Sequence, residues 1–590
     1  MTSIRIIIIT NFLITIIQFA SADFQRLHVK DGALFFENGE EAVFWGVNLQ
    51  PSLSWEYNRM KRHGLHSPLN LKSYKKMIDE AFSELEMLGC NLIRIHLSPG
   101  DITDKNGNLV ENHWLDLTDY VLAEAEKRNM YTYLALLNSL GRDRGENTFI
   151  PKNKHSKPSW MIDPDFIVKS DLYIRQLLNR KNKYANGVKY KDSPALAFVE
   201  PINEPDYFTR ETITSSHQCN KFYIDWLSNK EKIDSDEAFS EWRMHKTKSY
   251  INKMVKLFKE EKVSAPMVWS MEWPRMMEWT GPDVFVAAAE SDVEVLSVCL
   301  YPGQSVAYGK KSNDLKDVGE KNYFEYIQNC YDLPEWHGWM REKRFLNKAR
   351  IVYEFETYYN HSSYLYPLMA KYFRAQGIQA AAMWTYLLPG QAEYTAASHH
   401  FNLKTTPNKA ASFMIAGEIM RNLSRYEPFV TTTEYSDYSE HFALSYQIGS
   451  SAYADEKKLI YSESMPKEFI ENLKYDQSSL SRVIGKGHSP LASYDGSGLY
   501  FINRINSKSV EITILPDATF ISPFYLTNKR KERVVSIKDD VEHLFRIDLP
   551  KTSKLTSVYR LENGKRQKVR NHFDDNLYFK ARAGSYIINH

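Results

Sequence analysis

The sequence has few cysteines. Only four occur in 590 residues, at positions 90, 219, 299 and 330, and four are too few for the disulfide framework of a small secreted domain. Cys90 and Cys299 lie in apolar runs that resemble strands, so we expect them to be buried as small apolar side chains. Cys219 and Cys330 lie in predicted loops and could pair. No cysteine has the spacing of a zinc site.

The sequence also lacks an excess of either charge. It contains 75 Lys and Arg against 73 Asp and Glu, a formal net charge of +2, and no long run of basic residues. This balance argues against nucleic acid or an anionic membrane surface as a partner and favours a neutral one. The 37 Tyr and 12 Trp would suit stacking on sugar rings, although aromatic side chains mostly fill cores.

No apolar run beyond the N-terminus is long enough to span a bilayer. At the N-terminus a single Arg precedes an apolar stretch over residues 6–19, and Ala-Ser-Ala follows at 20–22. This pattern predicts a cleaved secretory signal over residues 1–22, with an uncleaved anchor as the alternative. No cysteine follows until Cys90, so a lipoprotein is not expected. We expect a secreted or periplasmic protein that is not inserted in the membrane.

A length of 590 residues exceeds what one hydrophobic core supports, so two or more domains are expected. Between residues 42 and 386, apolar runs alternate with segments of helical periodicity, such as 71–89, with Gly89 as C-cap, and 236–262. Apolar strands that are each followed by a helix predict an α/β fold, a parallel (β/α)8 TIM barrel, rather than an open sheet. The eight runs are 42–48, 90–97, 131–137, 195–203, 267–271, 293–301, 350–355 and 379–386.

The predicted domains are a barrel over residues 23–426 and an all-β sandwich over 427–590. The barrel domain begins with a small β cap, whose hairpin turns are expected at Asp31-Gly32 and Asn38-Gly39. After residue 427 the helical periodicity stops and short alternating runs follow, separated by turn residues. Two of the turns are expected at Asn506-Ser507 and Asn563-Gly564.

Two glutamates end predicted barrel strands. Active residues of such barrels lie at the carboxyl ends of the strands, and Glu204 follows the fourth run while Glu354 lies at the end of the seventh. Two carboxylates across one cleft suit glycosidic cleavage, because one protonates the leaving oxygen and the other captures or stabilises the oxocarbenium-like centre. Glu200 lies deeper in the fourth run and is expected to be a structural acid, paired with Arg94 or another buried donor.

Motifs at several strand ends resemble those of a known family. "NLIRIH" ends the second run, "NEP" the fourth, "CLYP" the sixth, "YEF" the seventh and "MWTY" the eighth, and "YKDSPALAFVEPINEP" leads into the fourth. Together these motifs resemble clan A glycoside hydrolases, most closely family 5, which contains cellulases and mannanases. The resemblance covers most of residues 35–425 and does not extend to the C-terminal region.

The resemblance implies a retaining mechanism. Glu204 matches the acid/base and Glu354 the nucleophile of the family. Two further residues are expected to act on Glu354: Arg94 would hydrogen-bond it and hold it ionised, and Tyr301 would donate to it. Asn203 is expected to bind the sugar 2-hydroxyl, and Trp384 to form the floor beneath the sugar. His96 is expected near the site.

Several assignments have alternatives. Glu356 lies two residues after Glu354 and, by strand alternation, would face the same way, so it is the rival nucleophile. Asn138, at the end of the third strand, is a possible subsite contact. The sequence departs from the family pattern at Cys299, Glu356 and Asp206, where His, Gly and a basic residue are common, so the sugar is not determined.

The predicted function is an exported retaining β-glycoside hydrolase that acts on a β-mannan- or β-glucan-like polysaccharide or oligosaccharide. No cofactor and no metal are expected. A metal-dependent hydrolase on the same fold is one rival reading, but it would need His-x-His at the end of the first strand, which here ends in "GVNLQP". The alternative is a barrel without catalysis that binds glycans. The oligomeric state is open.

Overall fold

The structure is a computed structural model. It describes residues 24–49, 52–65, 68–138, 147–151, 154–205, 207–271, 281–304, 315–357, 359–394, 399–521, 533–548, 556–562, 565–569 and 578–589. The predicted signal over residues 1–22, Asp206 and the turn at Asn563-Gly564 therefore lie outside the described residues.

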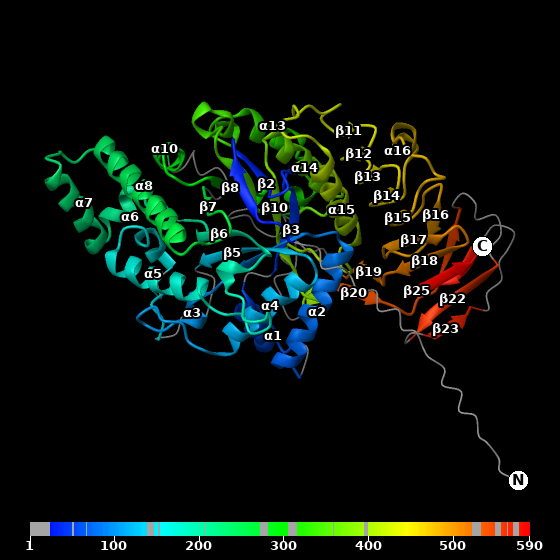
Figure 1. Ribbon diagram of the computed structural model, residues 1–590. Coiled ribbons are helices and arrows are strands. Elements are labelled where there is room, and N and C mark those ends of the chain that lie inside the picture. Colours follow the sequence, from blue (N-terminus) through cyan, green and yellow to red (C-terminus); the bar gives the residue numbers. More distant parts are fainter. Residues whose placement is uncertain are drawn as a thin grey trace, which may run out of the picture.

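Eight parallel strands form a barrel, as predicted. Their order in the sheet is β6-β5-β4-β3-β10-β9-β8-β7, and a parallel bridge between Val199 and Met267 joins the two ends of the sheet. Figure 1 shows the barrel helices around these strands, with the C-terminal strands on one side. The strands are β3 (Phe44–Leu49), β4 (Leu92–His96), β5 (Tyr131–Leu137), β6 (Leu196–Ile202), β7 (Val268–Ser270), β8 (Val295–Leu300), β9 (Ala349–Phe355) and β10 (Ala380–Tyr386).

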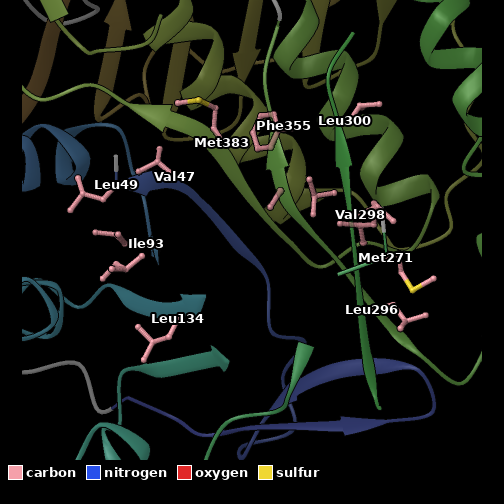
Figure 2. Packing of buried hydrophobic residues seen from close by; sticks show 14 of the residues in the cluster. Val47, Leu49, Ile93, Leu134, Met271, Leu296, Val298, Leu300, Phe355 and Met383 are labelled. Atoms are coloured by element: carbon pink, nitrogen blue, oxygen red, sulfur yellow. The ribbon is translucent and has the colours of Figure 1, made fainter. Parts of the chain in front are cut away.

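Along each barrel strand, every second residue faces the surrounding helices. The residues between them face the inside of the barrel. Figure 2 shows Leu296, Val298 and Leu300 along one side of β8, together with side chains from the neighbouring strands. These residues belong to the large core that packs strands against helices, whereas Cys299 belongs to a separate core inside the barrel. The period of two therefore directs the intervening residues, including Arg94, toward the barrel axis.

At least one helix follows every barrel strand. The predicted helix over 71–89 is α2, which ends with C-cap Leu88 and then Gly89 in the left-handed region at φ 72°. The helices are α1 (Leu53–His63), α2 (Leu71–Met87), α3 (Pro99–Ile102), α4 (His113–Lys127), α5 (Pro164–Leu178), α6 (Arg210–Thr214), α7 (His217–Asn229), α8 (Asp236–Glu260), α10 (Asp283–Ala289), α12 (Leu315–Glu320), α13 (Phe324–Asp332), α14 (Leu365–Ala375) and α15 (Pro407–Asn422).

Short 3-10 helices lie in the loops of the barrel domain. They are η1 (Lys154–Ser159), η2 (Tyr190–Asp192), η4 (Gly338–Arg341), η5 (Lys343–Phe345) and η6 (Ala392–Tyr394).

A small hairpin precedes the barrel, as expected. Strands β1 (Leu27–Lys30) and β2 (Ala33–Phe36) pair antiparallel around Asp31 and Gly32, both with positive φ. Leu27 and Leu34 of this hairpin belong to the same core as Phe44, the first residue of β3. The hairpin therefore covers the end of the barrel at which the strands begin.

The C-terminal region is a β structure of several sheets. In its described residues, fifteen strands form sheets of ten, three and two strands. One core contains residues of the ten-stranded and three-stranded sheets, as expected of a sandwich. The strands are β11 (Ser436–Tyr438), β12 (Phe442–Ser445), β13 (Ser450–Ala454), β14 (Lys458–Tyr461), β15 (Arg482–Gly485), β16 (Ala492–Tyr494), β17 (Tyr500–Asn506), β18 (Ser509–Ile514), β19 (Asp517–Phe520), β20 (Val535–Lys538), β21 (His543–Ile547), β22 (Ser557–Glu562), β23 (Lys565–Lys568), β24 (Tyr578–Ala581) and β25 (Gly584–Asn589).

Two details of this region differ from the sequence-based expectation. The β17–β18 loop is Ser507-Lys508, one position after the predicted turn, because Asn506 pairs with Ser509. A short helix, α16 (Lys467–Asn472), lies between β14 and β15, and these two strands pair in parallel. The precise boundary at 426/427 stays a prediction; α15 ends at Asn422 and β11 begins at Ser436.

All four cysteines lie in the described residues and are buried thiols. Cys219 is in α7 and Cys330 in α13, so both lie in helices rather than in the predicted loops. Within the described part of the chain, no helix has the length and apolar character needed to cross a bilayer.

Candidate active site

A buried arginine connects the carboxyl ends of four barrel strands. Arg94 of β4 is fully buried. Its Nη1 donates to Glu354 Oε1 of β9 (2.7 Å) and to Asn48 Oδ1 of β3 (2.9 Å), and its Nη2 donates to Glu200 Oε2 of β6 (2.8 Å) and to Asn203 Oδ1 (2.7 Å). One guanidinium therefore compensates two buried carboxylates and fixes their geometry. The expected pairing of Glu200 with Arg94 is present.

Glu354 is held on both carboxylate oxygens. In addition to Arg94, Tyr301 Oη donates to Glu354 Oε2 at 2.6 Å, and His96 Nε2 lies 3.4 Å from Oε1. Burial raises the pKa of Glu354 above its ordinary value, while Arg94 and the Tyr301 hydrogen bond act in the opposite direction. The sequence-based expectation considered only the effect of Arg94, which favours the ionised form of Glu354. The structure adds the effect of burial, which opposes ionisation.

A bulge in β9 places two consecutive residues on the inside of the barrel. The pairing with β8 runs from Val298↔Val352 to Cys299↔Glu354, which leaves Tyr353 as the extra residue. Tyr353 belongs to the core inside the barrel, and Glu354 bonds Arg94 there. Simple alternation would have sent one of the two toward the helices.

Glu356 does not face the site, and the expectation from strand alternation is wrong. Strand β9 ends at Phe355, so alternation no longer applies to the next residue. Glu356 Oε1 accepts hydrogen bonds from Lys409 Nζ of α15 (2.9 Å), Tyr366 Oη of α14 (2.8 Å) and Thr357 N (2.5 Å). The helices therefore hold Glu356, whereas Glu354 faces the barrel axis.

Glu204 lies two residues beyond the end of β6, with φ 45°. Such a conformation is uncommon outside glycine and is concentrated at functional sites. Tyr353 Oη donates to its Oε1 at 3.2 Å. Burial and then the nearby Glu354 charge raise the pKa of Glu204 to about 7. Glu204 thus has a higher proton affinity than an ordinary glutamate, whereas Glu354 has a cation and a phenol as partners.

Asn203 and Trp384 border the same network. Asn203 Oδ1 accepts from Arg94, and in the described structure its amino group has no acceptor. Trp384, on β10, is partly buried, and its ring meets that of His96 edge-on with centroids 5.0 Å apart. Burial, followed by Arg94, lowers the pKa of His96 well below its usual value, so its imidazole is neutral.

Asn138 is less suited to contact a substrate. Its side chain is buried, and its Nδ2 donates to the backbone carbonyl of Leu97 at 2.6 Å. This bond ties the end of β5 to the segment after β4. Its predicted role as a subsite contact stays a prediction.

Sequence reasoning missed Tyr353, which donates to Glu204, and two polar residues around Arg94. Asn48 Oδ1 accepts from Arg94 and contacts His96 Nε2 at 3.0 Å, while its Nδ2 donates to the carbonyl of Tyr353 at 3.1 Å. Tyr133 Oη donates to Glu200 Oε2 at 2.5 Å. An asparagine at the end of the apolar run "VFWGVN" was the available signal for Asn48. For Tyr133, nothing in the sequence distinguished it from a core aromatic residue.

Close polar contacts therefore connect five of the predicted site residues: Arg94, His96, Asn203, Tyr301 and Glu354. Glu204 is connected to this group through Tyr353, and Trp384 is connected to it through His96. In the described residues no group of three or more His, Cys, Asp or Glu is arranged to hold a metal ion. The roles of these residues stay predictions.

The Lys409–Glu356 pair gives a stability prediction. Both side chains are almost completely buried, so Lys409→Met leaves a carboxylate buried without its cation. We expect the free energy of unfolding to fall by about 3–5 kcal/mol, as measured by urea denaturation. The double variant Glu356→Gln/Lys409→Met should recover part of the loss because it buries no uncompensated charge. Equal stability of the single variant and wild type would contradict this reading of the pair.

Two comparisons with curated proteins identify relatives. The chain is 34% identical over 91 residues to putative mannan endo-1,4-beta-mannosidase 9 of Oryza sativa subsp. japonica, which is 15% of this chain and 22% of that protein. It is 31% identical over 94 residues to mannan endo-1,4-beta-mannosidase 5 of Arabidopsis thaliana, again 22% of that protein. The chain is thus similar to these two plant proteins over about 15% of its length. It spans about a fifth of the length of these relatives, 22% in each case.

The comparisons with family models and solved structures complete these results. No family model matches the chain. Among solved structures, the glycoside hydrolase family 5 mannosidase from Rhizomucor miehei aligns with 68% of this chain and 100% of its own, with 12% identity and a TM-score of 0.42. The two plant sequences agree with the resemblance to mannanases inferred from the motifs, over the 91 and 94 residues that they match.

Proposed function

We propose that this chain is a retaining β-glycoside hydrolase that cleaves a β-mannan- or β-glucan-like polysaccharide or oligosaccharide. The observation that carries the proposal is the contrast between two carboxylates at one barrel mouth. Glu354 is bound by Arg94 and Tyr301, while the pKa of Glu204 is raised to about 7. Carboxylates in such different environments are typical of the nucleophile and the acid/base of glycosidases.

The proposed reaction has two steps. In the first, a Glu354 oxygen attacks the anomeric carbon, the glycosidic C–O bond breaks, and the Glu204 proton passes to the leaving oxygen. In the second, water attacks the anomeric carbon, Glu204 takes a proton from that water, and the bond to Glu354 breaks. The two inversions give net retention of configuration. The loss of the Glu354 charge in the intermediate lowers the proton affinity of Glu204, which suits its change from acid to base.

The surrounding residues position the reactants. Arg94 and Tyr301 orient the Glu354 carboxylate and leave its charge available for attack. The Asn203 amino group is proposed to donate to the sugar 2-hydroxyl, and the Trp384 ring to form the floor beneath the sugar. His96 is neutral and supports the Trp384 ring edge-on.

The names of the two plant relatives support β-mannan as the first substrate to test. The test is release of reducing ends from β-mannan, glucomannan and β-1,4-glucan, with and without a chelator, and 1H NMR of the first anomer formed. We expect activity on at least one polymer, insensitive to chelator, with the β-anomer appearing first. Activity that is lost with chelator, or initial appearance of the α-anomer, would contradict the mechanism. Binding without cleavage of any polymer would favour a glycan-binding protein.

Export is part of the proposal. The N-terminal signal predicted over residues 1–22 implies a mature chain that begins at Asp23. N-terminal sequencing of the protein from the culture medium or periplasm should give "DFQRLHVK". Recovery of the uncleaved chain in the membrane fraction would support the anchor instead.

The charge states of the two glutamates predict the pH dependence. Glu204 must carry a proton when the first step begins, and its pKa is about 7, so kcat/KM should fall as the pH rises through about 7. Glu354 must be ionised, so kcat/KM should also fall at low pH, where Glu354 takes up a proton. The result is a bell-shaped profile with its maximum on the acid side of pH 7. A profile that rises through pH 7 to a plateau would contradict the assignment of Glu204 as the acid.

A further inference from the structure

The segment that follows β10 reaches the candidate site through a histidine. The ring of His399 packs on that of Tyr301, with centroids 5.3 Å apart. Tyr301 in turn donates to Glu354. The position of His399 therefore limits the positions open to the phenol that holds the proposed nucleophile.

The C-terminal region contacts this same segment. Strands β19 and β20 form a hairpin separate from the large sheet, and in Figure 1 they lie on the side of that region facing the barrel. The ring of Phe520, at the end of β19, meets the rings of His361 and His400 edge-on, with centroids 5.1 Å and 5.8 Å apart. His400 is the residue next to His399.

A second contact lies at the start of β20. Val534 N donates to the carbonyl of Glu393 at 2.7 Å, and Arg533 Nε lies 3.1 Å from the Glu393 carboxylate. The Arg533 guanidinium also lies over the Tyr394 ring, 5.5 Å from its centroid. Glu393 and Tyr394 belong to η6, between β10 and His399. The hairpin thus contacts the segment after β10 on both sides of residues 395–398.

The barrel side of this segment is connected to the end of β9. Lys409 Nζ donates to the backbone carbonyl of His400 at 3.0 Å and also to Glu356, two residues beyond Glu354. A chain of polar contacts therefore runs from His400 through Lys409 to Glu356, close in sequence to the proposed nucleophile. Phe520 packs on the His400 ring at the other end of this chain.

We propose that the β19–β20 hairpin is a positioning element of the active site, which holds the segment after β10 so that His399 fixes Tyr301 against Glu354. Phe520 and Arg533 are the positioning residues, and neither contacts the substrate. The inference rests on the proposed function for its kinetic consequences, but its structural part does not depend on activity. It gives the C-terminal region a role within the catalytic site that no sequence motif indicated.

The kinetic test compares matched variants in the full-length chain. Phe520→Ala removes a partly buried ring that packs on histidines beside the site, whereas Phe35→Ala removes one that packs on His28 in the N-terminal hairpin. We expect Phe520→Ala to lower kcat by roughly 10- to 100-fold with little change in KM, because misplacement of catalytic groups acts on the transition state. Phe35→Ala should keep the wild-type kcat.

Arg533→Ala tests the same contact in case Phe520→Ala does not fold. The Arg533 side chain is about half exposed, so its removal should disturb the fold little. Its matched control is Arg546→Ala, which removes a similar pairing with a carboxylate, Asp548, and a tyrosine ring, Tyr578, within the same region. Arg533→Ala should lower kcat and Arg546→Ala should not. In a Tyr301→Phe background, Phe520→Ala should have a smaller effect than in wild type, because both changes act on one hydrogen bond.

Hydrogen exchange tests the structural part without activity. Phe520→Ala should accelerate amide exchange in residues 399–406 and at the end of β9, whereas Phe35→Ala should not. Unchanged exchange there, or wild-type kcat in both Phe520→Ala and Arg533→Ala, would overturn the inference even if wild type is an active glycosidase. A wild type without activity but with the expected exchange pattern would overturn the proposed function and leave the positioning role supported.

Discussion

Replacement of Glu354 by alanine should reduce kcat on the polysaccharide by about 10⁴-fold or more, because the double displacement then has no group to attack the anomeric carbon. The variant should remain folded, since Ala relieves the cost of burying a carboxylate while Arg94 keeps Glu200 as a partner. The measurement is reducing-end release at high enzyme concentration, together with unfolding by circular dichroism. Added azide should restore cleavage by attacking the anomeric carbon from the vacated side, which gives a glycosyl azide of inverted configuration; this product has no new reducing end and is detected by mass spectrometry and NMR.

Glu356→Gln is the matched control for Glu354→Ala. Glutamine keeps an acceptor for Tyr366 and Lys409 at nearly the same volume, and the residue faces α14 and α15 rather than the barrel axis. Stability should fall, because Lys409 loses its counter-charge, but activity should stay within a few-fold of wild type. Near-normal activity in Glu354→Ala combined with loss in Glu356→Gln would show that the nucleophile has been assigned to the wrong residue.

The second large effect is expected for Glu204→Gln. Loss of the general acid should lower kcat on polysaccharides by about 10²–10⁴-fold, the usual contribution of proton transfer by a positioned side chain. Substrates whose leaving group needs no proton, such as dinitrophenyl glycosides, should keep a much larger share of their rate in the first step. The fall in kcat/KM above pH 7 should also disappear for these substrates, because the group with a pKa of about 7 is gone.

Two results would argue against this role of Glu204. The first is an equal loss on activated and natural substrates, since that would indicate damage to binding or to folding rather than to proton transfer. The second is an unchanged limb near pH 7 in Glu204→Gln, which would assign that titration to another group. Glu200→Gln provides the comparison: it lies deeper on β6 and pairs with Arg94 and Tyr133, so it should affect stability without a dependence on the leaving group.

Arg94 explains how two buried glutamates coexist in one barrel. A single buried carboxylate without a partner costs several kcal/mol, and here one guanidinium donates to both Glu200 and Glu354. Tyr133 and Tyr301 supply one further donor to each. The polar network of the site is therefore also part of the barrel core. A substitution in this network is expected to change both the activity of the site and the stability of the barrel.

Much of the architecture could be read from the sequence. The eight apolar runs became β3 to β10 because buried parallel strands carry apolar residues on both faces and so appear as continuous runs. Helix α2 was predicted from apolar residues at intervals of three and four together with Gly89, whose left-handed conformation ends the helix. These signals are local, since each depends on the side chains of one segment.

The parts that were missed or wrong depend on non-local structure. Glu356 was expected beside Glu354, but β9 has a bulge at Tyr353 and ends at Phe355, and both features are set by neighbouring strands and helices. Asn48 and Tyr133 enter the site only because β3 and β5 lie next to β4 in the closed sheet. No spacing in the sequence reports such neighbours.

The sequence by itself determined that this chain forms a (β/α)8 barrel with a β-rich C-terminal region, and which strands end in ionisable residues, because hydrophobic periodicity and turn residues act within a segment. Only the tertiary structure decided which glutamate faces the barrel axis, which groups share Arg94, and that the β19–β20 hairpin reaches the segment behind Tyr301. The physical reason is that burial, charge pairing and proton affinity depend on neighbours in space, and the barrel brings Glu204 and Glu354 together from positions 150 residues apart.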